Sequence, residues 1–191
     1  MGLARAPDGP SLAPPVVLDG NPYNGATPTD QKSIPEGAEQ IFVMSEDIAD
    51  NVKEDLAWGT YVLLRNTNSI SVLISVQDAL CVRGYWNTPK DLSKEKIADW
   101  FRMQIQRIGF SDLKDTVYFQ QAIDSELKEM VPAGTRSLLV QPIILDALSN
   151  QTDNRKGFVL LASSIDYAFT DKDKAWISAI ANKFTGGGCL P

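Results

Sequence analysis

The residues of this chain that could do chemistry are few, and their types exclude most enzymatic mechanisms. The sequence contains no histidine, and its two cysteines, Cys81 and Cys189, are far apart. A serine or cysteine nucleophile activated by histidine is therefore excluded, as is a metal or iron held by histidines of this chain. Two distant cysteines are also too few for a disulfide scaffold or a zinc knuckle. We therefore expect no metal site, and we favour a domain without catalytic activity of its own.

One polar group is spaced as the face of a β-strand. Side chains alternate across a strand, so residues 80–86 place Cys81, Arg83 and Tyr85 on one face. That face could line a ligand pocket, in which arginines bind an anion through charge-assisted hydrogen bonds; Arg136 is a further candidate. The alternative is that the arginines lie in solvent or in ion pairs and that Cys81 is a small buried apolar residue.

A second group consists of aromatic and small residues on two expected helices. Each residue lies beside, rather than within, the apolar stripe that would face the core. Exposed aromatic side chains next to small ones are typical of a partner interface. The alternative is that the two helices cover one another or the proline-rich N-terminal segment. The candidate interface residues are Trp58, Tyr61 and Arg65 on the first helix and Ala175, Trp176 and Ala179 on the last.

The elements that must position these residues follow from hydrophobic periodicity and from capping residues. Ser45, Ser93 and Thr170 are the expected N-caps of three helices. Gly109 is expected to end the second helix, and Asp173 to complete a capping box with Thr170. We expect helices over 46–65, 94–108 and 171–184, and strands over 70–76, 80–86, 116–119, 137–145 and 157–163.

The two last strands indicate how the layers are arranged. Residues 137–145 and 157–163 are almost continuously apolar, so antiparallel strands here need cover on both faces. Helices are the available cover, which predicts the layers helix, sheet, helix. The fold class is therefore α+β, a three-layer α/β/α arrangement with a mainly antiparallel sheet of five or six strands.

The composition bounds the domain organisation and the partners. A chain of 191 residues is expected to be one domain with tails. Seven of the eleven prolines lie in residues 1–36, which we interpret as a disordered or extended tail. The domain is expected over 37–185, followed by a flexible Gly-rich tail over 186–191. Lys and Arg number 18 against 24 Asp and Glu, which argues against a general nucleic-acid binder. We find no apolar run long enough to span a bilayer and no signal peptide.

Two resemblances agree with this layout. The run Gly157–Ser164 followed by Tyr167–Asp173 resembles the ending of a GAF domain, which makes the expected fold GAF-like. Four longer runs are similar to the family of proteins for cofactor assembly of complex C. These runs are Glu54–Asn68, Arg83–Pro89, Gly134–Pro142 and Asp173–Ile177.

The family resemblance implies an assembly factor on the stromal side of the chloroplast thylakoid membrane. It would help to attach the singly thioether-bonded haem to cytochrome b of the cytochrome bf complex. It implies that the domain is a protein-interaction scaffold for a paralogous GAF-like subunit, with which it would form a heterodimer, and for the cytochrome b apoprotein. Membrane attachment would come only from segments absent from this chain.

The GAF resemblance implies a different use of the polar residues. GAF pockets lie between the sheet and the links across it, here residues 87–135, where Arg83, Arg102 or Arg136 would meet haem propionates or another anion. The alternative function is therefore a GAF-type sensor domain that binds a tetrapyrrole or another small anionic ligand. For the isolated domain we expect no cofactor, or haem held only transiently.

Overall fold

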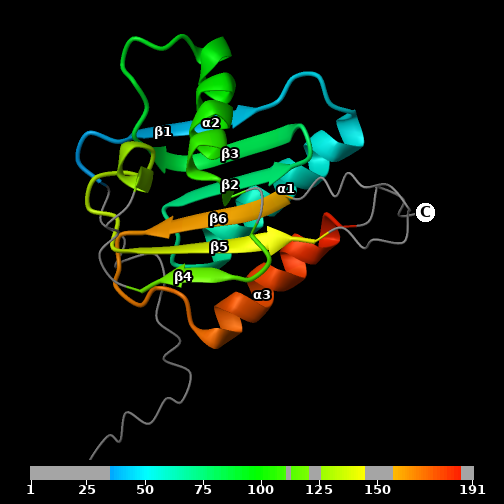
Figure 1. Cartoon of the computed structure of the whole chain (residues 1–191), viewed down its shortest axis with the longest axis vertical. Coiled ribbons are helices and arrows are strands. Elements are labelled where there is room, and N and C mark those ends of the chain that lie inside the picture. Colours follow the sequence, from blue (N-terminus) through cyan, green and yellow to red (C-terminus); the bar gives the residue numbers. More distant parts are fainter. Residues whose placement is uncertain (1–34, 111–112, 121–125, 145–156, 186–191) are drawn as a thin grey trace, which may run out of the picture.

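Six antiparallel strands form a single sheet in the order β1-β3-β2-β6-β5-β4 in the computed structural model of this chain (Figure 1). The structure describes residues 35–110, 113–120, 126–144 and 157–185. Hairpins join β2 to β3 and β5 to β6, and β1 and β4 are the two edge strands. The strands are β1 (Glu39–Met44), β2 (Ser71–Val76), β3 (Ala79–Trp86), β4 (Val117–Phe119), β5 (Ser137–Ile143) and β6 (Gly157–Ser163).

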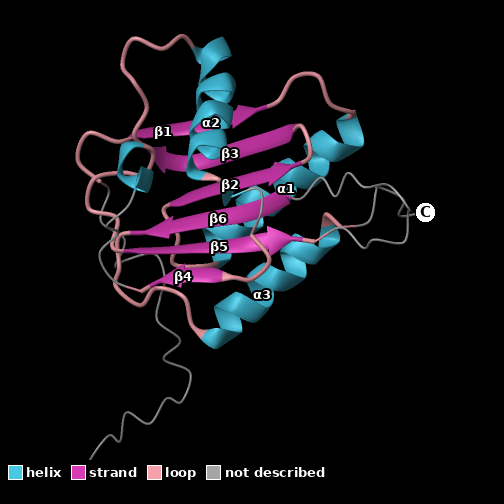
Figure 2. Cartoon of the chain, viewed as in Figure 1, coloured by secondary structure: helices cyan, strands magenta, loops and turns pink. Residues whose placement is uncertain are grey.

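Helices cover both faces of the sheet, as Figures 1 and 2 show. One face carries α2 (Lys94–Ile108), while α1 (Asp50–Asn66) packs against β2 and β3 on the other and α3 (Asp171–Lys183) packs beside it against β5 and β6. A short 3₁₀ helix, η2 (Glu126–Glu129), precedes β5. The predicted α+β fold with a six-stranded antiparallel sheet is therefore confirmed, and a GAF-like arrangement is compatible with it. No helix within the described ranges is both long and apolar enough to cross a membrane.

Strand alternation divides the interior into two cores. On β3, Leu80 and Val82 point toward α2, and Cys81 between them points toward α1 and α3. The α2 core also contains the fully buried rings of Trp86 and Phe101. Burying one such large apolar side chain stabilises the fold by about 1.5–3 kcal/mol, so both faces of the sheet contribute substantially. The main members of the other core are Leu56, Leu63, Val72, Ile74, Val159, Leu161 and Ile177.

Two of the three expected helix starts, and the expected end of α2, lie where the sequence predicts them. Ser93 occupies the N-cap of α2, and Gly109 ends this helix in the left-handed region at φ 75°. Thr170 and Asp173 form a reciprocal capping box at the start of α3, in which Thr170 Oγ1 accepts the Asp173 N–H and Asp173 accepts the Thr170 N–H. These predictions are confirmed because each depends on residues that are adjacent in sequence.

The predicted start of the first helix is wrong. The helix begins at Asp50 with Ala49 at the N-cap, and Ser45 belongs to the end of β1. The Ser45 N–H donates to Leu80 O and Ser45 Oγ accepts the Leu80 N–H, each at 2.9 Å. The hydroxyl of Ser45 therefore extends the β1–β3 ladder by one residue and is not available to cap a helix. Strand β1 itself is the sixth strand, which the hydrophobic pattern did not separate from the helix that follows.

The remaining boundaries shift by small amounts. Strand β5 ends at Ile143, two residues earlier than expected, and β4 begins at Val117. The hairpin loop expected over 149–154 lies outside the described residues. The tail expected over 1–36 lies outside them except for its last two residues, and the tail over 186–191 lies outside them entirely. The domain limits therefore stay predictions.

Candidate functional site: the face of α1 and α3

Cys81 lies in the middle of β3 with its thiol buried beneath α1. The side chain has no exposed surface, and Sγ lies 3.5 Å from the Thr60 hydroxyl of α1. Burial raises the pKa of the Cys81 thiol, outweighing the lowering effects of the hydrogen bond with Thr60 and of the Arg83 charge. Cys81 is therefore a neutral thiol at pH 7, and a neutral thiol is a poor nucleophile and a poor metal ligand.

Arg83 lies two residues further along the same face and is half-buried. Its guanidinium carbon is 4.0 Å from the centroid of the Phe42 ring and 5.9 Å from that of Tyr61. Its Nε donates to Thr60 Oγ1 at 3.3 Å. In the part of the chain that the structure describes, Arg83 makes no ion pair with a carboxylate. The guanidinium is thus held in place by two rings and a hydroxyl, with its terminal nitrogens unpaired.

The other two candidate ligand residues lie apart from this pair. Tyr85 is half-buried near the end of β3, opposite Gln40 of β1. Arg136 immediately precedes β5 and forms an exposed ion pair with Asp166 at 2.9 Å. Strands β2 and β6 separate β5 from β3, so these arginines are separated by roughly three strand spacings of about 4.8 Å each. The structure therefore does not bring Arg136 together with Cys81 and Arg83.

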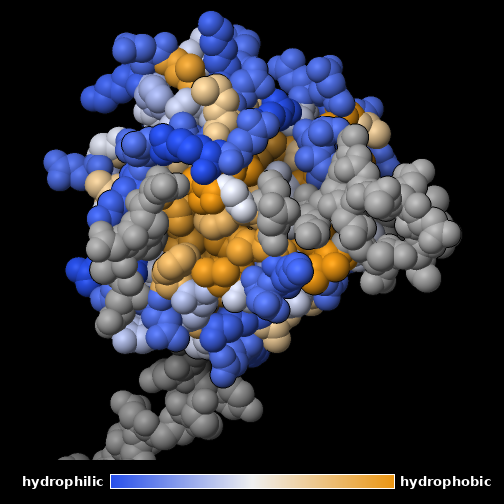
Figure 3. All heavy atoms as spheres, viewed as in Figure 1, coloured by the Kyte–Doolittle hydropathy of each residue, from blue (hydrophilic) through white to orange (hydrophobic). Residues whose placement is uncertain are grey.

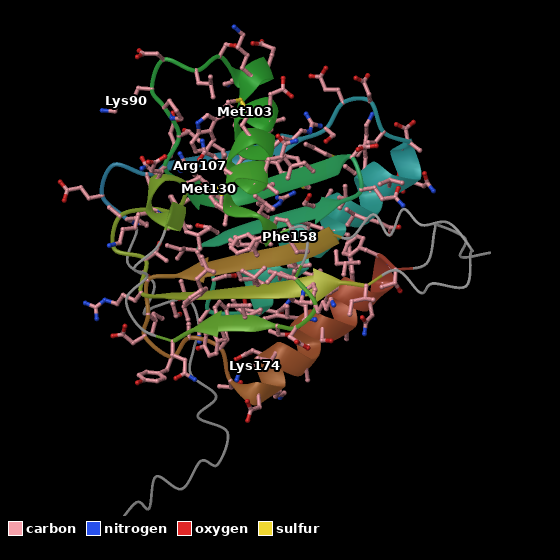
Figure 4. All side chains as sticks on the ribbon, in the orientation of Figure 1. Lys90, Met103, Arg107, Met130, Phe158 and Lys174 are labelled. Carbon is pink, nitrogen blue, oxygen red and sulfur yellow. The ribbon has the colours of Figure 1, made fainter. Side chains whose placement is uncertain are left out.

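The face beneath residues 87–135 is the other one. That segment contains α2, and the side chains under it are apolar, as Figures 3 and 4 show for the centre of this face and for Phe158. Leu80 and Val82 of β3 point there, whereas Cys81 and Arg83 point to the α1 side. The candidate ligand residues therefore do not line a pocket beneath residues 87–135, and their role in ligand binding stays a prediction.

The candidate interface residues on α1 and α3 are exposed. Trp58 and Trp176 each expose 41% of their surface and Tyr61 exposes 53%. Arg65, Ala175 and Ala179 are exposed as well. Large aromatic groups in contact with water are costly unless a partner covers them. This exposure is the property that an interface requires, although the interface itself stays a prediction.

The two helices meet at one point, through residues that the sequence analysis did not identify. Lys183 Nζ at the end of α3 lies 3.3 Å from Asp55 Oδ1 and 4.2 Å from the centroid of the Trp58 ring. Beside them, a Cβ on Gly59 would lie 2.8 Å from the ring of Phe184, so glycine permits this close approach. No local signal predicts a contact across more than 120 residues; it follows only once α1 and α3 are known to share a face. Trp176 lies seven residues before Lys183, roughly 10 Å along the helix axis.

Two grooves border strand β1. A shallow groove of about 480 Å³ separates β1 from α1, and Phe42, Met44 and Ala57 provide its apolar lining. A larger groove of about 850 Å³ lies between β1 and α2 and has mixed charge. There Arg102 pairs with Asp99 at 2.7 Å and donates to Ser45 Oγ. Phe42 escaped the sequence analysis because β1 was not recognised as a strand.

Metal chemistry finds no support in the described ranges. No group of three or more Cys, Asp or Glu side chains there is placed to hold a metal ion. The acidic residues lie mostly on exposed positions of α1, α3 and the loops.

Comparisons with known proteins agree on one family. The CCB2/CCB4 family of proteins for cofactor assembly of complex C matches residues 17–184. A chloroplastic protein of Arabidopsis thaliana, the cofactor assembly of complex C protein CCB2, is 53% identical over 158 residues, which are 82% of this chain and 57% of that relative. The chain thus spans a little more than half of the relative's length.

One solved structure is similar at a lower level. It is the type II free methionine-R-sulfoxide reductase of Thermoplasma acidophilum, with a TM-score of 0.42 and 14% identity. The match covers 72% of this chain and 93% of that one. A likeness of this size carries no argument about the function of the chain.

Proposed function

Because the chain belongs to the CCB2/CCB4 family for cofactor assembly of complex C, we propose that it is a chloroplast assembly factor that acts by holding other proteins together. The cofactor is haem, attached covalently to cytochrome b of the cytochrome bf complex, and the site is the stromal side of the thylakoid membrane. Haem is here the cargo of the assembly reaction rather than a resident cofactor. The chloroplastic relative supports the compartment.

The proposed partner is a paralogous subunit of the same family. The family description joins CCB2 with CCB4, and the 53% identity with a CCB2 makes a CCB4-type protein the natural candidate. The observation that carries this proposal is the aromatic surface of α1 and α3, where Trp58, Tyr61 and Trp176 are exposed. Tryptophan, tyrosine and arginine are the residues that most often anchor protein interfaces. The cytochrome b apoprotein is the second proposed partner.

Holding partners accounts for this chain better than catalysis does. The chain has no histidine for acid–base catalysis near neutral pH. Its one described cysteine, Cys81, is buried as a neutral thiol under α1. We therefore assign no catalytic step to residues of this chain, and we propose that the isolated domain holds haem no more than transiently.

One observation favours the second candidate, a GAF-type sensor for a tetrapyrrole or another small anion. Arg83 is a half-buried cation without a carboxylate partner among the described residues. Such a group suits an anionic ligand. Its surroundings are open rather than enclosed, since the neighbouring rings of Phe42 and Tyr61 are half-exposed, and small-molecule sites usually bury most of their ligand.

A single pair of measurements tests both candidates. The purified chain is mixed with the CCB4-type protein of the same organism, and the mass of the product is measured by light scattering after gel filtration. The chain is separately mixed with haem and its absorbance is measured. The assembly proposal expects a 1:1 complex with the paralogue and no stoichiometric Soret band that survives gel filtration. A stable haem complex without paralogue binding would establish the sensor instead.

A further inference from the structure

We propose that Arg83, between the rings of Phe42 and Tyr61, is a binding site for a carboxylate that the paralogous partner presents on an aspartate or glutamate side chain. The inference rests on the proposed pairing with a paralogue. It goes beyond that pairing because it identifies a specific anchor on β3 and the chemistry of the group that occupies it. It also moves the interface away from α3 and toward the edge of the sheet at β1.

Arg83 differs from the other arginines of the domain. Three other described arginines, Arg102, Arg107 and Arg136, each have a carboxylate oxygen at 2.7–2.9 Å. Arg83 has none among the described residues, although it is more buried than the exposed Arg107 and Arg136. A half-buried cation without a counter-charge is unfavourable. A carboxylate from outside the chain would supply that counter-charge.

Three elements fix the guanidinium before any partner arrives. Phe42 of β1 is the direct cross-strand neighbour of Arg83 on β3, and its ring lies under the guanidinium at 4.0 Å. Thr60 of α1 accepts a hydrogen bond from Nε, and Tyr61, the next residue, borders the other side at 5.9 Å. The two terminal nitrogens therefore remain for a bidentate contact, the geometry in which arginine binds carboxylates best. A side chain that is already ordered loses less entropy on binding.

The surroundings favour a protein as the source of the carboxylate. Phe42 exposes 52% and Tyr61 53% of their surface, so the cation lies on an open face rather than in an enclosed cavity. The apolar groove lined by Phe42, Met44 and Ala57 continues from this point along β1. Trp58 lies one helical turn from Tyr61 on α1. An arginine among exposed aromatic residues, next to an apolar groove, has the composition of an interface hot spot.

The experiment measures, by calorimetry, the affinity of the chain for the CCB4-type protein, in wild type and in matched arginine variants. Arg83→Ala is expected to weaken binding about thirtyfold, the range of an interface hot spot. Arg83→Lys, which keeps the charge but loses the planar fork, is expected to weaken it about tenfold. The matched control is Arg107→Glu on α2, on the opposite face of the sheet, which is expected to leave the affinity unchanged. Circular dichroism and urea unfolding establish that each variant is folded, and Arg83→Lys replaces Arg83→Ala if the alanine variant is not.

Each outcome decides one proposal. If the wild-type chain does not bind the paralogue, the proposed function fails and this inference fails with it. If wild type binds and both Arg83 variants bind within about threefold of it, the inference alone is overturned. Sodium propionate tests the other source of the carboxylate, followed through the Nε–H signal of Arg83 by nuclear magnetic resonance. Saturable propionate binding below about 1 mM, a free energy near 4 kcal/mol, would assign Arg83 to a free small anion and overturn the partner assignment.

Discussion

The two faces of the sheet use their aromatic residues in opposite ways. On the α2 face the aromatic residues form the core: Trp86 and Phe101 are fully buried, with their ring centroids 5.1 Å apart in an edge-to-face contact. On the α1 and α3 face the core is aliphatic, and the aromatic residues Trp58, Tyr61 and Trp176 point outward. Aromatic side chains bury the largest area per residue. One face therefore uses this area to fold the chain, and the other leaves it available for a partner.

This difference also explains which helix each partner would contact. The outward face of α2 is largely polar, with Arg107 paired to Glu129 and Arg102 paired to Asp99. Exposed ion pairs of this kind satisfy their own charges and contribute little to stability or binding. On α1, by contrast, the neighbouring cations Arg83 and Lys183 lie over exposed rings. The predictions below test whether this contrast is functional, from the largest expected effect to the smallest.

The largest effect is expected in the α2 core. Phe101→Ala removes a fully buried ring that contacts Trp86 and Trp100, so it should lower the free energy of unfolding by about 3–5 kcal/mol. Trp58→Ala on α1 removes a larger side chain but a half-exposed one, and its cost should stay below about 1 kcal/mol. Urea unfolding of both variants measures the difference. Equal costs would place Trp58 in the core and remove the contrast between the faces.

The next effect is expected in binding. Truncating both Trp58 and Trp176 to alanine should cost about 2 kcal/mol or more of binding to the paralogue if either ring is a central anchor. The fold should survive, because both side chains are exposed. Circular dichroism and capture of the paralogue are measured on the same sample. Undiminished capture by a folded double variant would move the interface to the α2 face. Loss of folding would show instead that the tryptophans stabilise the domain.

The layers and most helix ends could be predicted because their signals are local. The apolar runs of β5 and β6 required cover on both faces, and Thr170, Asp173 and Gly109 are capping residues whose roles depend on the next few residues only. The start of α1 could not be predicted in the same way. Ser45 has the residue type of an N-cap, but its hydroxyl bonds to Leu80, which is 35 residues away. Tertiary pairing overrode local preference there.

The candidate site was less predictable than the fold. Alternation along β3 placed Cys81 and Arg83 on one face, but the sequence does not say which helices cover that face. The contact partners of Arg83 come from β1 and α1, and Phe42 could be identified only by the register of β1 with β3. The ion pair of Asp55 with Lys183 joins the two ends of the domain. Contacts of this kind depend on the assembled fold, so no single segment predicts them.

A smaller effect concerns the buried thiol on the α1 side of the sheet. Because the pKa of Cys81 is raised in the folded state, the thiol ionises first in the unfolded chain. Its contribution to stability should be complete below about pH 8.5 and be lost as the pH rises above that value, by at most about 1.4 kcal/mol per pH unit. Urea unfolding of wild type and Cys81→Ala between pH 7.5 and 10, in reducing buffer, measures the two slopes. The wild-type slope should be the steeper one; equal slopes would mean that the thiol reaches solvent and that α1 leaves room for a ligand over β3.

The smallest effect is expected at the rim of the α1 surface. Arg65 is exposed near the end of α1, about 10 Å along the axis from Trp58, so its charge should guide the approach of the partner without being buried. Arg65→Glu should therefore slow association several-fold, with dissociation little changed. The effect should shrink in high salt, where the screening length falls to about 3 Å at 1 M. Stopped-flow association at two salt concentrations measures this, with Arg107→Glu on α2 as the control of equal charge change. If the two variants slow association equally, the effect comes from net charge alone and the two faces of the sheet do not differ in the way proposed.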